Sequence, residues 1–440
     1  MSTEDARTIH EETATGRNQS TMVTCGLLWG AGTGAIFSVF GTVTFLAGGK
    51  FVPEIPCAVA GLMLAVVLPG FLRAFFTEVQ RSGYAMLLIL FLALFGVGYL
   101  AHGDAVSAYQ DVRAATIAVT MACLFSVLRS RYDEFATPAL LTMALSSVFL
   151  SIWYFFSSGL LWMEKCNFSA FAILSAVFIC FMRFGRMYGL AAVGIMLGPA
   201  LVSGFRIHFL TLVIGAILGT AIGGGKGVAS RARHGVVTVM CGAALLGCVY
   251  LGARWAVENQ DVEDVFRPYP VLHGQFYLKT KLLLSPSAAD EFGGEASAQG
   301  RLTMLGEPFK DPMAYLLPKG FGVWAHYEQE GRADWHPMDN GLMGVIFIGG
   351  WLLTIPFFLA LGATASSSLN GLRGASMELF RRYAIAVGLF CIAYVVFIGG
   401  TVYLQPVHSS FFGAAIGYFV IGPCRWADLT YRSAPQRGSR

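Results

Sequence analysis

The sequence predicts an all-α, polytopic integral membrane protein with about 12 transmembrane helices. Apolar runs of about 20 residues, enough for a helix to cross a bilayer, recur along the chain. Hydrophobic residues make up 55% of the composition and charged residues 13%, and the mean hydropathy of +0.62 excludes an ordinary soluble domain. Lysine and arginine gather in alternate connections, as they do when cytoplasmic loops retain positive charge.

Nine predicted spans precede one long polar stretch and three follow it. The spans are expected at residues 22–48, 56–76, 84–103, 114–128, 138–160, 168–182, 187–203, 207–223, 235–256, 341–362, 383–403 and 407–423. Residues 1–21 are polar and lack the basic start and apolar core of a signal peptide, so we expect a disordered cytoplasmic tail. The remaining parts are helices 1–9 (22–256), a long extracytoplasmic loop (257–340), helices 10–12 (341–423) and a basic cytoplasmic tail (424–440).

The distribution of positive charge orients these spans. With a cytoplasmic N-terminus, the inside segments hold 18 of the 30 lysines and arginines, whereas the short outside connections hold only Lys50, Arg113, Lys165 and Arg206. Both termini are therefore expected inside and the long loop outside. The net charge of +4 follows from this arrangement and from anionic lipid, so it gives no reason to expect nucleic-acid binding.

Two patterns that suggest soluble-protein chemistry are better explained otherwise. Residues 30–35 (Gly-Ala-Gly-Thr-Gly-Ala) fit a loose dinucleotide-binding fingerprint, but they lie inside a predicted span with no preceding strand. Close helix packing through small residues is the better interpretation. The nine cysteines are scattered, form no Cys-x-x-Cys pair and are absent from the long loop, so we expect neither disulfides nor a thiolate zinc site there.

The polar residues of interest lie on the predicted outer side. Arg206 opens the eighth span, where an arginine either snorkels to the interface or serves a polar cavity. Arg301 lies in the long loop, where the alternative to a binding role is a solvated surface arginine. Lys319, Gly320 and Gly322 belong to a Lys-Gly-Phe-Gly turn, which lets the backbone approach a ligand closely, although a plain loop turn uses the same glycines.

Taken in order, these features resemble the O-antigen polymerase and ligase superfamily. Its pattern is an arginine that opens a span after a Ser or Gly, an arginine in a long outer loop, a Gly-x-Gly turn, and a His-Asn or Asp-Asn pair at the start of the next span, followed by glycines. The counterparts here are Arg206, Arg301, Gly320 to Gly322, Asp339-Asn340 and Gly349-Gly350. The likeness covers residues 203–360 in motifs and the whole chain in topology.

The resemblance implies a GT-C-like, metal-independent glycosyltransferase of the bacterial inner membrane, without a cofactor and with its active site in the loop facing the periplasm. Its donor would be a glycan on undecaprenyl pyrophosphate, and its product a surface polysaccharide such as the O-antigen of lipopolysaccharide in the cell envelope. Arg206 and Arg301 would bind the pyrophosphate and stabilise the charge that develops as the sugar leaves. Lys319, Gly320, Gly322 and Asn340 would complete the substrate-binding residues.

The acceptor hydroxyl must lose a proton, and His336 and Asp339 are the candidate bases. We favour His336, because a neutral imidazole accepts a proton near neutral pH, with Asp339 orienting it or the acceptor and Asn340 holding the turn. A surface imidazole and a helix N-terminal carboxylate are the plain alternatives. Ligases place a histidine where Asp339 stands, which favours a polymerase that extends a glycan over a ligase that transfers it to lipid A core or protein.

Two other classes of protein stay open. Twelve spans and an intramembrane arginine are compatible with a secondary transporter or flippase, although the sequence shows no pair of halves with correspondingly broken helices. A noncatalytic membrane partner in an envelope assembly is the other possibility.

Overall fold

The computed structural model describes residues 19–38, 54–81, 84–157, 168–203, 206–223, 308–322, 341–370, 379–394 and 406–421, with a few isolated residues between 240 and 306. All regular secondary structure in these ranges is helical. Four of the described helices are long and apolar enough to cross a membrane, namely Gln19–Ser38, Tyr84–His102, Ala105–Arg131 and Asp133–Trp153, and five shorter apolar helices accompany them. The all-helical prediction is therefore confirmed for the described residues, and these apolar helices agree with a membrane protein. The number of spans stays a prediction.

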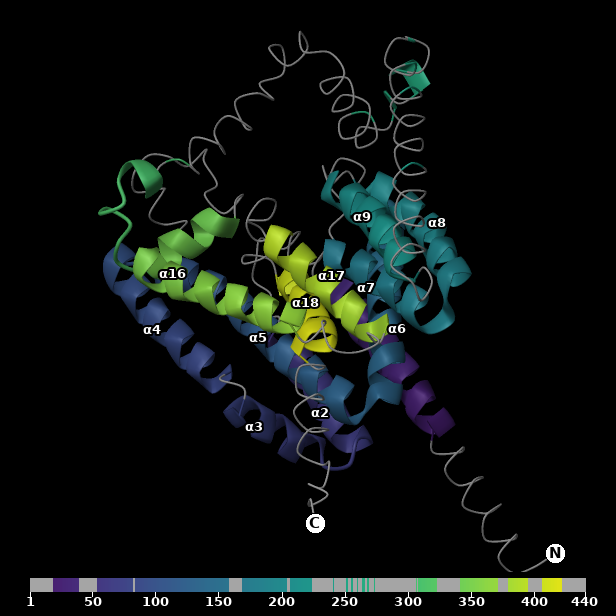
Figure 1. Ribbon diagram of the computed structural model, residues 1–440, viewed down its shortest axis with the longest axis horizontal. Helices are drawn as coiled ribbons and strands as arrows, with labels where there is room; N and C mark the ends of the chain where they lie inside the picture. The colour runs from purple at the N-terminus through teal and green to yellow at the C-terminus, as the bar shows by residue number, and fades with distance from the viewer. Residues whose placement is uncertain are drawn as a thin grey trace, which may run out of the picture.

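The helices follow one another in a bundle. After the helix Gln19–Ser38 come α2 (Glu54–Val67), α3 (Phe71–Arg81), α4 (Tyr84–His102), α5 (Ala105–Arg131), α6 (Asp133–Ser157), α7 (Ala170–Ile179), η1 (Cys180–Phe184), α8 (Arg186–Val202), α9 (Arg206–Gly223), α16 (Gly341–Asn370), α17 (Leu379–Ala393), α18 (Pro406–Ala415) and η6 (Ile416–Ile421). In Figure 1, α4 lies at one edge of the bundle beside α5 and α16, and α8 and α9 lie at the opposite side.

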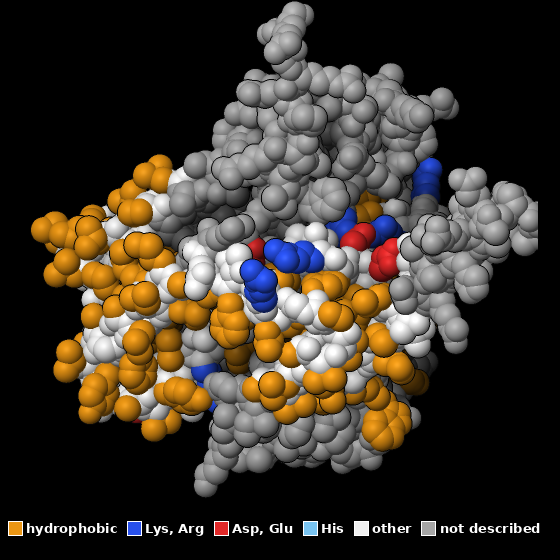
Figure 2. Space-filling view, turned by 90° about the horizontal axis from the view of Figure 1, so that it is seen from below, with side chains coloured by type: hydrophobic (Ala, Val, Ile, Leu, Met, Phe, Trp, Pro, Cys, Tyr) orange, Lys and Arg blue, Asp and Glu red, His pale blue; other side chains and the backbone are white. Residues whose placement is uncertain are grey.

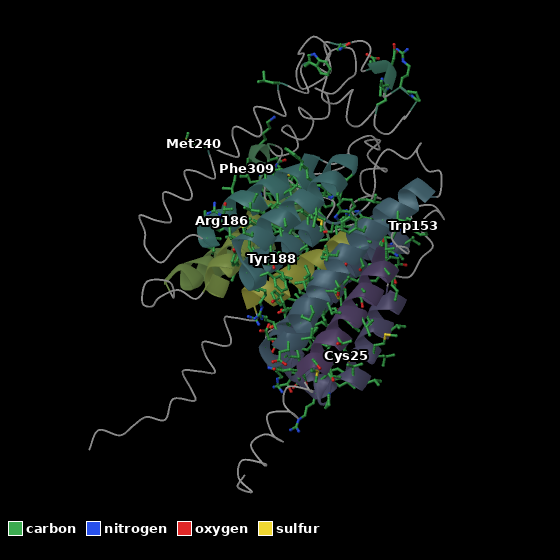
Figure 3. The ribbon with its side chains drawn as sticks, turned by 90° about the vertical axis from the view of Figure 1, so that its right-hand side faces the viewer. Cys25, Trp153, Arg186, Tyr188, Met240 and Phe309 are labelled. Carbon is green, nitrogen blue, oxygen red and sulfur yellow. The ribbon has the colours of Figure 1, made fainter. Side chains whose placement is uncertain are left out.

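Small residues bring the helix Gln19–Ser38 against α6. A Cβ atom on Gly30 would lie 2.1 Å from the backbone oxygen of Ala139. One turn before and after, Cβ atoms on Gly26 and Gly34 would lie 2.6 Å and 2.2 Å from the α6 backbone. These contacts advance in the same direction along both helices, which therefore run parallel. Cys25 and Trp153 mark opposite ends of this pair in Figure 3. The small-residue interpretation of residues 30–35 is thus confirmed for Gly30 and Gly34.

This packing predicts a sharp difference between two neighbouring glycines. Gly30→Leu should destabilise the protein by about 1–3 kcal/mol or more, because the added side chain meets the α6 backbone. Gly32→Leu is the matched control, since a Cβ atom there meets nothing within 4 Å. Thermal unfolding of the two purified variants in one detergent measures the difference. An equal loss of stability in both would contradict the packing.

Close glycine contacts also join α5 to α18 and η6. A Cβ atom on Gly413 would lie 2.0 Å from the backbone oxygen of Ala118, and one on Gly417 would lie 2.2 Å from that of Ala122. Both contacts advance by four residues along each element, so α18 and η6 run parallel to α5. The start of α18 therefore lies beside the start of α5.

The bundle has two distinct ends. We call the end at which α5 begins the loop end, because residues 308–322 pack there, and the opposite end the arginine end. At the arginine end, Asp133 of α6 pairs with Arg129 of α5 and Arg183 of η1. Beside them, Thr137 and Tyr418 share a hydrogen bond of 2.8 Å that joins α6 to η6. The two parallel pairs, Gln19–Ser38 with α6 and α5 with α18 and η6, have the relative directions that alternating spans require. Which end faces the cytoplasm stays a prediction.

The prediction of one continuous helix over residues 56–76 for the second span is wrong. α2 ends at Val67, and α3 begins at Phe71 after a turn in which Gly70 has a φ of +75°. Proline at position 69 and glycine at position 70 interrupt the apolar run. α3 buries Phe71 and Ala74 but exposes Leu72 and Phe76, so apolar side chains lie on both its buried and its exposed faces.

The tenth span, predicted over residues 341–362, is not one straight helix either. α16 is interrupted at Gly350, whose φ of 61° and ψ of 174° lie outside the helical region. Its two halves meet there at an angle (Figure 1). The second half, residues 351–370, is about 30 Å long at about 1.5 Å per residue, and the first half is about half as long.

Some predicted boundaries cannot be compared. Residues 1–18, most of the ninth span (235–256) and residues 424–440 lie outside the described residues. Residues 19–21 were expected in the N-terminal tail but belong to the first helix. Within the described ranges, the other spans match helices whose ends differ by a few residues, apart from α5, which begins nine residues before the predicted 114.

Aromatic and aliphatic side chains fill the centre of the bundle. Phe125, Phe135, Phe171 and Phe411 are fully buried in one large cluster. Apolar side chains also cover much of the outside, where Val66 is 86% and Leu100 84% exposed. Figure 2 shows hydrophobic side chains over most of the described surface on that face, with charged side chains in a few small groups. Such a surface suits a lipid environment.

Candidate site at the loop end

Residues 308–322 return from the long loop and pack on the bundle. Figure 1 shows this connecting segment reaching α16. Trp351 of α16 holds the start of this segment. Its indole Nε1–H donates to the backbone oxygen of Pro308 at 3.3 Å, and its ring centroid lies 5.2 Å from that of Phe309, which is labelled in Figure 3. This part of the long loop is therefore built into the helical domain.

The segment satisfies the backbone where α16 is broken. In an uninterrupted helix the N–H groups of residues 351 and 352 would donate to the carbonyls of residues 347 and 348. Here all four groups bond to the segment instead. The N–H groups of Trp351 and Leu352 donate to the carbonyls of Tyr315 at 2.8 Å and Leu316 at 3.2 Å. The carbonyls of Phe347 and Ile348 accept from the N–H groups of Lys319 at 3.3 Å and Gly320 at 3.0 Å. An unsatisfied backbone group in a membrane costs several kcal/mol, so the segment stabilises the break.

Glycine makes this close docking possible. Gly320 has a φ of +76°, and a Cβ atom on it would lie 2.2 Å from the backbone nitrogen of Gly98 in α4. The next residue, Phe321, donates its N–H to the backbone oxygen of Leu94 at 3.1 Å. The close neighbour of Gly320 in this structure is α4, and the approach of the turn to a ligand stays a prediction.

Phe321 anchors the segment in a small apolar cluster. Its side chain is 3% exposed and packs with Leu94, Ala108 and Phe347 from three different helices. Its ring meets that of Phe91 edge to face at 5.9 Å. Burial of one phenylalanine side chain contributes about 1.5–3 kcal/mol, which favours the docked position of the segment.

Two polar side chains hold the backbone on either side of Phe321. The Asp111 carboxylate of α5 is 3% exposed, and its Oδ2 accepts the N–H of Gly322 at 2.9 Å. His102, at the end of α4 and 7% exposed, lies with Nε2 3.2 Å from the carbonyl oxygen of Lys319. Because a carbonyl only accepts, Nε2 of His102 carries the proton in this bond.

The Lys319 ammonium is held among aromatic rings. Its Nζ lies 4.8 Å from the ring centroid of Tyr315 and 4.9 Å from that of Phe347. Cation–π contacts of this kind are worth about 0.5–2 kcal/mol each. Lys319 is half-buried, so its positive charge has a defined place at the loop end.

A second buried polar cluster surrounds the start of α9. His208 is fully buried, its Nδ1 lies 2.7 Å from Ser203 Oγ, and its ring stacks on Phe168 at 4.3 Å. Since Ser203 Oγ donates to the backbone oxygen of Ala200 at 2.9 Å, it accepts from His208. His408 of α18 is close enough to interact electrostatically with His208. The helix that begins with Arg206 therefore starts at the loop end.

The structure describes only some of the predicted site residues. The backbone of Arg206 opens α9, but its side chain lies outside the described residues, as do Arg301, His336, Asp339 and Asn340. Their convergence on one site therefore stays a prediction. Lys319, Gly320 and Gly322 are described and lie together at the loop end.

Sequence reasoning missed Asp111 and His102. Asp111 was assigned to an outer connection, because the fourth span was expected to start at residue 114, whereas α5 begins at Ala105. A carboxylate within an apolar helix is the signal that could have drawn attention to it. His102 lies at the end of a correctly predicted span, where an isolated histidine carries little signal.

No family model matches the chain, and neither a curated protein nor a solved structure matches it. The resemblance of its motifs to a superfamily therefore enters only as part of a proposal.

Proposed function

We propose that this protein is a GT-C-like membrane glycosyltransferase that polymerises surface-polysaccharide repeat units on the periplasmic face of the bacterial inner membrane. Its donor is a glycan on undecaprenyl pyrophosphate, and its acceptor is another lipid-linked glycan. The observation that carries the proposal is the anchoring of the Lys319 motif at the end of the bundle where α9 begins with Arg206. Lys319 and the backbone of Arg206, which are distant in sequence, therefore lie at the same end of the bundle.

The proposed chemistry follows from the residue types. The acceptor hydroxyl attacks the anomeric carbon, its proton passes to His336 or Asp339, and the bond between the sugar and the pyrophosphate breaks. Negative charge then develops on the phosphate oxygens of the leaving undecaprenyl pyrophosphate. The guanidinium groups of Arg206 and Arg301 stabilise that charge, and Lys319 adds a third cation. Ligation to lipid A core or protein would use the same donor chemistry.

Transport is the second candidate, because α16 is broken at Gly350 as substrate-binding helices of transporters often are. In such transporters the freed carbonyls bind the coupling ion. Here the carbonyls of Phe347 and Ile348 accept N–H groups of Lys319 and Gly320 instead. This use of the break favours glycan transfer over transport.

A transfer assay separates these functions. The purified protein is placed in lipid nanodiscs and supplied with lipid-linked repeat units extracted from its native cells. It should produce longer lipid-linked glycans and release undecaprenyl pyrophosphate. Addition of EDTA should not prevent this reaction. Product that appears only when lipid A core is added would identify a ligase. Movement of the lipid-linked glycan across a proteoliposome membrane without any new glycosidic bond would replace the proposal with transport.

A further inference from the structure

The docked segment and the break in α16 depend on each other. Two N–H groups and two carbonyls of α16 leave their helical partners, and residues 315–320 supply two carbonyls and two N–H groups in return. If the segment left, these four groups of α16 would lose their partners within an apolar setting. Residues 315–320 therefore have one strongly favoured position. Contacts that hold the adjoining residues 321 and 322 also hold Lys319 in place.

The end of the segment is also held by contacts with α4 and α5, in addition to its backbone bonds with α16. Asp111 belongs to α5 and His102 to α4, whose Leu94 carbonyl also accepts the Phe321 N–H. Asp111 contacts Gly322 and His102 contacts the carbonyl of Lys319, so the two bonds lie on either side of the buried Phe321 in the sequence. The contact of Asp111 Oδ2 with the Gly322 N–H is 2.9 Å long and that of His102 Nε2 with the Lys319 carbonyl is 3.2 Å, so Asp111 makes the shorter of the two contacts.

We propose that Asp111 and His102 are positioning residues that hold the Lys319 ammonium at the loop end by latching residues 319–322 to α5 and α4. The latch acts through the backbone and needs no direct contact between Asp111 and a substrate. The use of Lys319 as a phosphate-binding cation rests on the proposed function. The latch itself does not.

Hydrogen exchange tests the latch without any substrate. In the purified full-length protein in nanodiscs, the amides of residues 319–322 should be protected in the wild type. Asp111→Leu should speed their exchange by about 10- to 100-fold, since the bond to the charged acceptor is lost. Asp111→Asn retains an acceptor oxygen and should restore most of the protection. His102→Leu and His102→Gln form the corresponding pair, because the glutamine amide can still donate to the Lys319 carbonyl.

Acylation of lysine provides the second readout. Lys319, which is half-buried, should react faster with an amine-specific reagent in Asp111→Leu, whereas exposed Lys310 on the same segment should react at an unchanged rate. Asp104→Asn is the matched control, because it removes a carboxylate two turns earlier in α5 and keeps the helix cap that Asp104 provides to Val106 and Ser107. It should change neither exchange nor acylation.

The outcomes separate the latch from the proposed function. Unchanged exchange of residues 319–321 and unchanged Lys319 acylation in Asp111→Leu would overturn the latch, whatever the protein catalyses. If the latch holds and glycan transfer depends on Lys319, Asp111→Leu should lower transfer in the wild-type background but not further in Lys319→Ala. A wild-type protein that shows the protected segment but no transfer would refute the proposed function and leave the latch intact.

Discussion

Replacing Arg206 or Arg301 with lysine is expected to lower the rate of glycan transfer by about 10²–10³-fold, and replacement with alanine should lower it more. Lysine keeps the positive charge but loses the planar fork that grips two phosphate oxygens. Removal of one preformed donor to a developing oxyanion typically costs this much in rate. Initial rates of transfer, normalised to the amount of membrane-inserted protein, measure the effect.

Arg186 provides the control for this experiment. It is an exposed arginine that begins α8, whereas Arg206 begins the next helix from the loop end. Arg186→Lys and Arg186→Ala should leave transfer within about twofold of wild type, as changes at surface sites usually do. Wild-type activity in Arg301→Ala would assign that residue to the solvated loop surface and remove it from the mechanism.

Helix positions were predictable because each span has a long apolar signal of its own. The run over residues 84–103 became α4 (Tyr84–His102), and the small-residue pattern at Gly30 and Gly34 became a close helix contact. In both cases the relevant information is local to the segment or repeats every fourth residue. Alternating charge further predicted which helix ends lie on the same side, and the parallel pairing of α5 with α18 agrees with it.

The break in α16 was not predictable in the same way. Gly349-Gly350 in an apolar run suggests a packing contact as readily as a break. What decides between them is the segment at residues 315–320, which is distant in sequence and supplies the missing backbone partners. The role of Asp111 also depends on this segment, since the Gly322 N–H that it binds belongs to the loop. Contacts of this kind leave no spacing pattern in the sequence.

His336→Ala is expected to lower turnover by about 10²–10⁴-fold while binding of the lipid-linked donor is retained. A positioned general base contributes a factor of this size, and the imidazole is the candidate that accepts a proton near neutral pH without a special environment. Donor binding should persist because it depends on the cations. Equilibrium binding of the labelled donor and single-turnover transfer measure the two effects separately.

Two companion variants decide between the candidate bases. His326→Ala removes another histidine of the same loop and should leave transfer unchanged, which controls for a general loss of imidazole in this region. Asp339→Asn keeps the size and a hydrogen-bonding group but cannot accept the proton, so under the favoured mechanism it should slow transfer less than His336→Ala does. Near-normal turnover in His336→Ala together with a large loss in Asp339→Asn would assign the proton to the carboxylate. That result would also require an environment that raises the basicity of Asp339, because an exposed aspartate is a weak base.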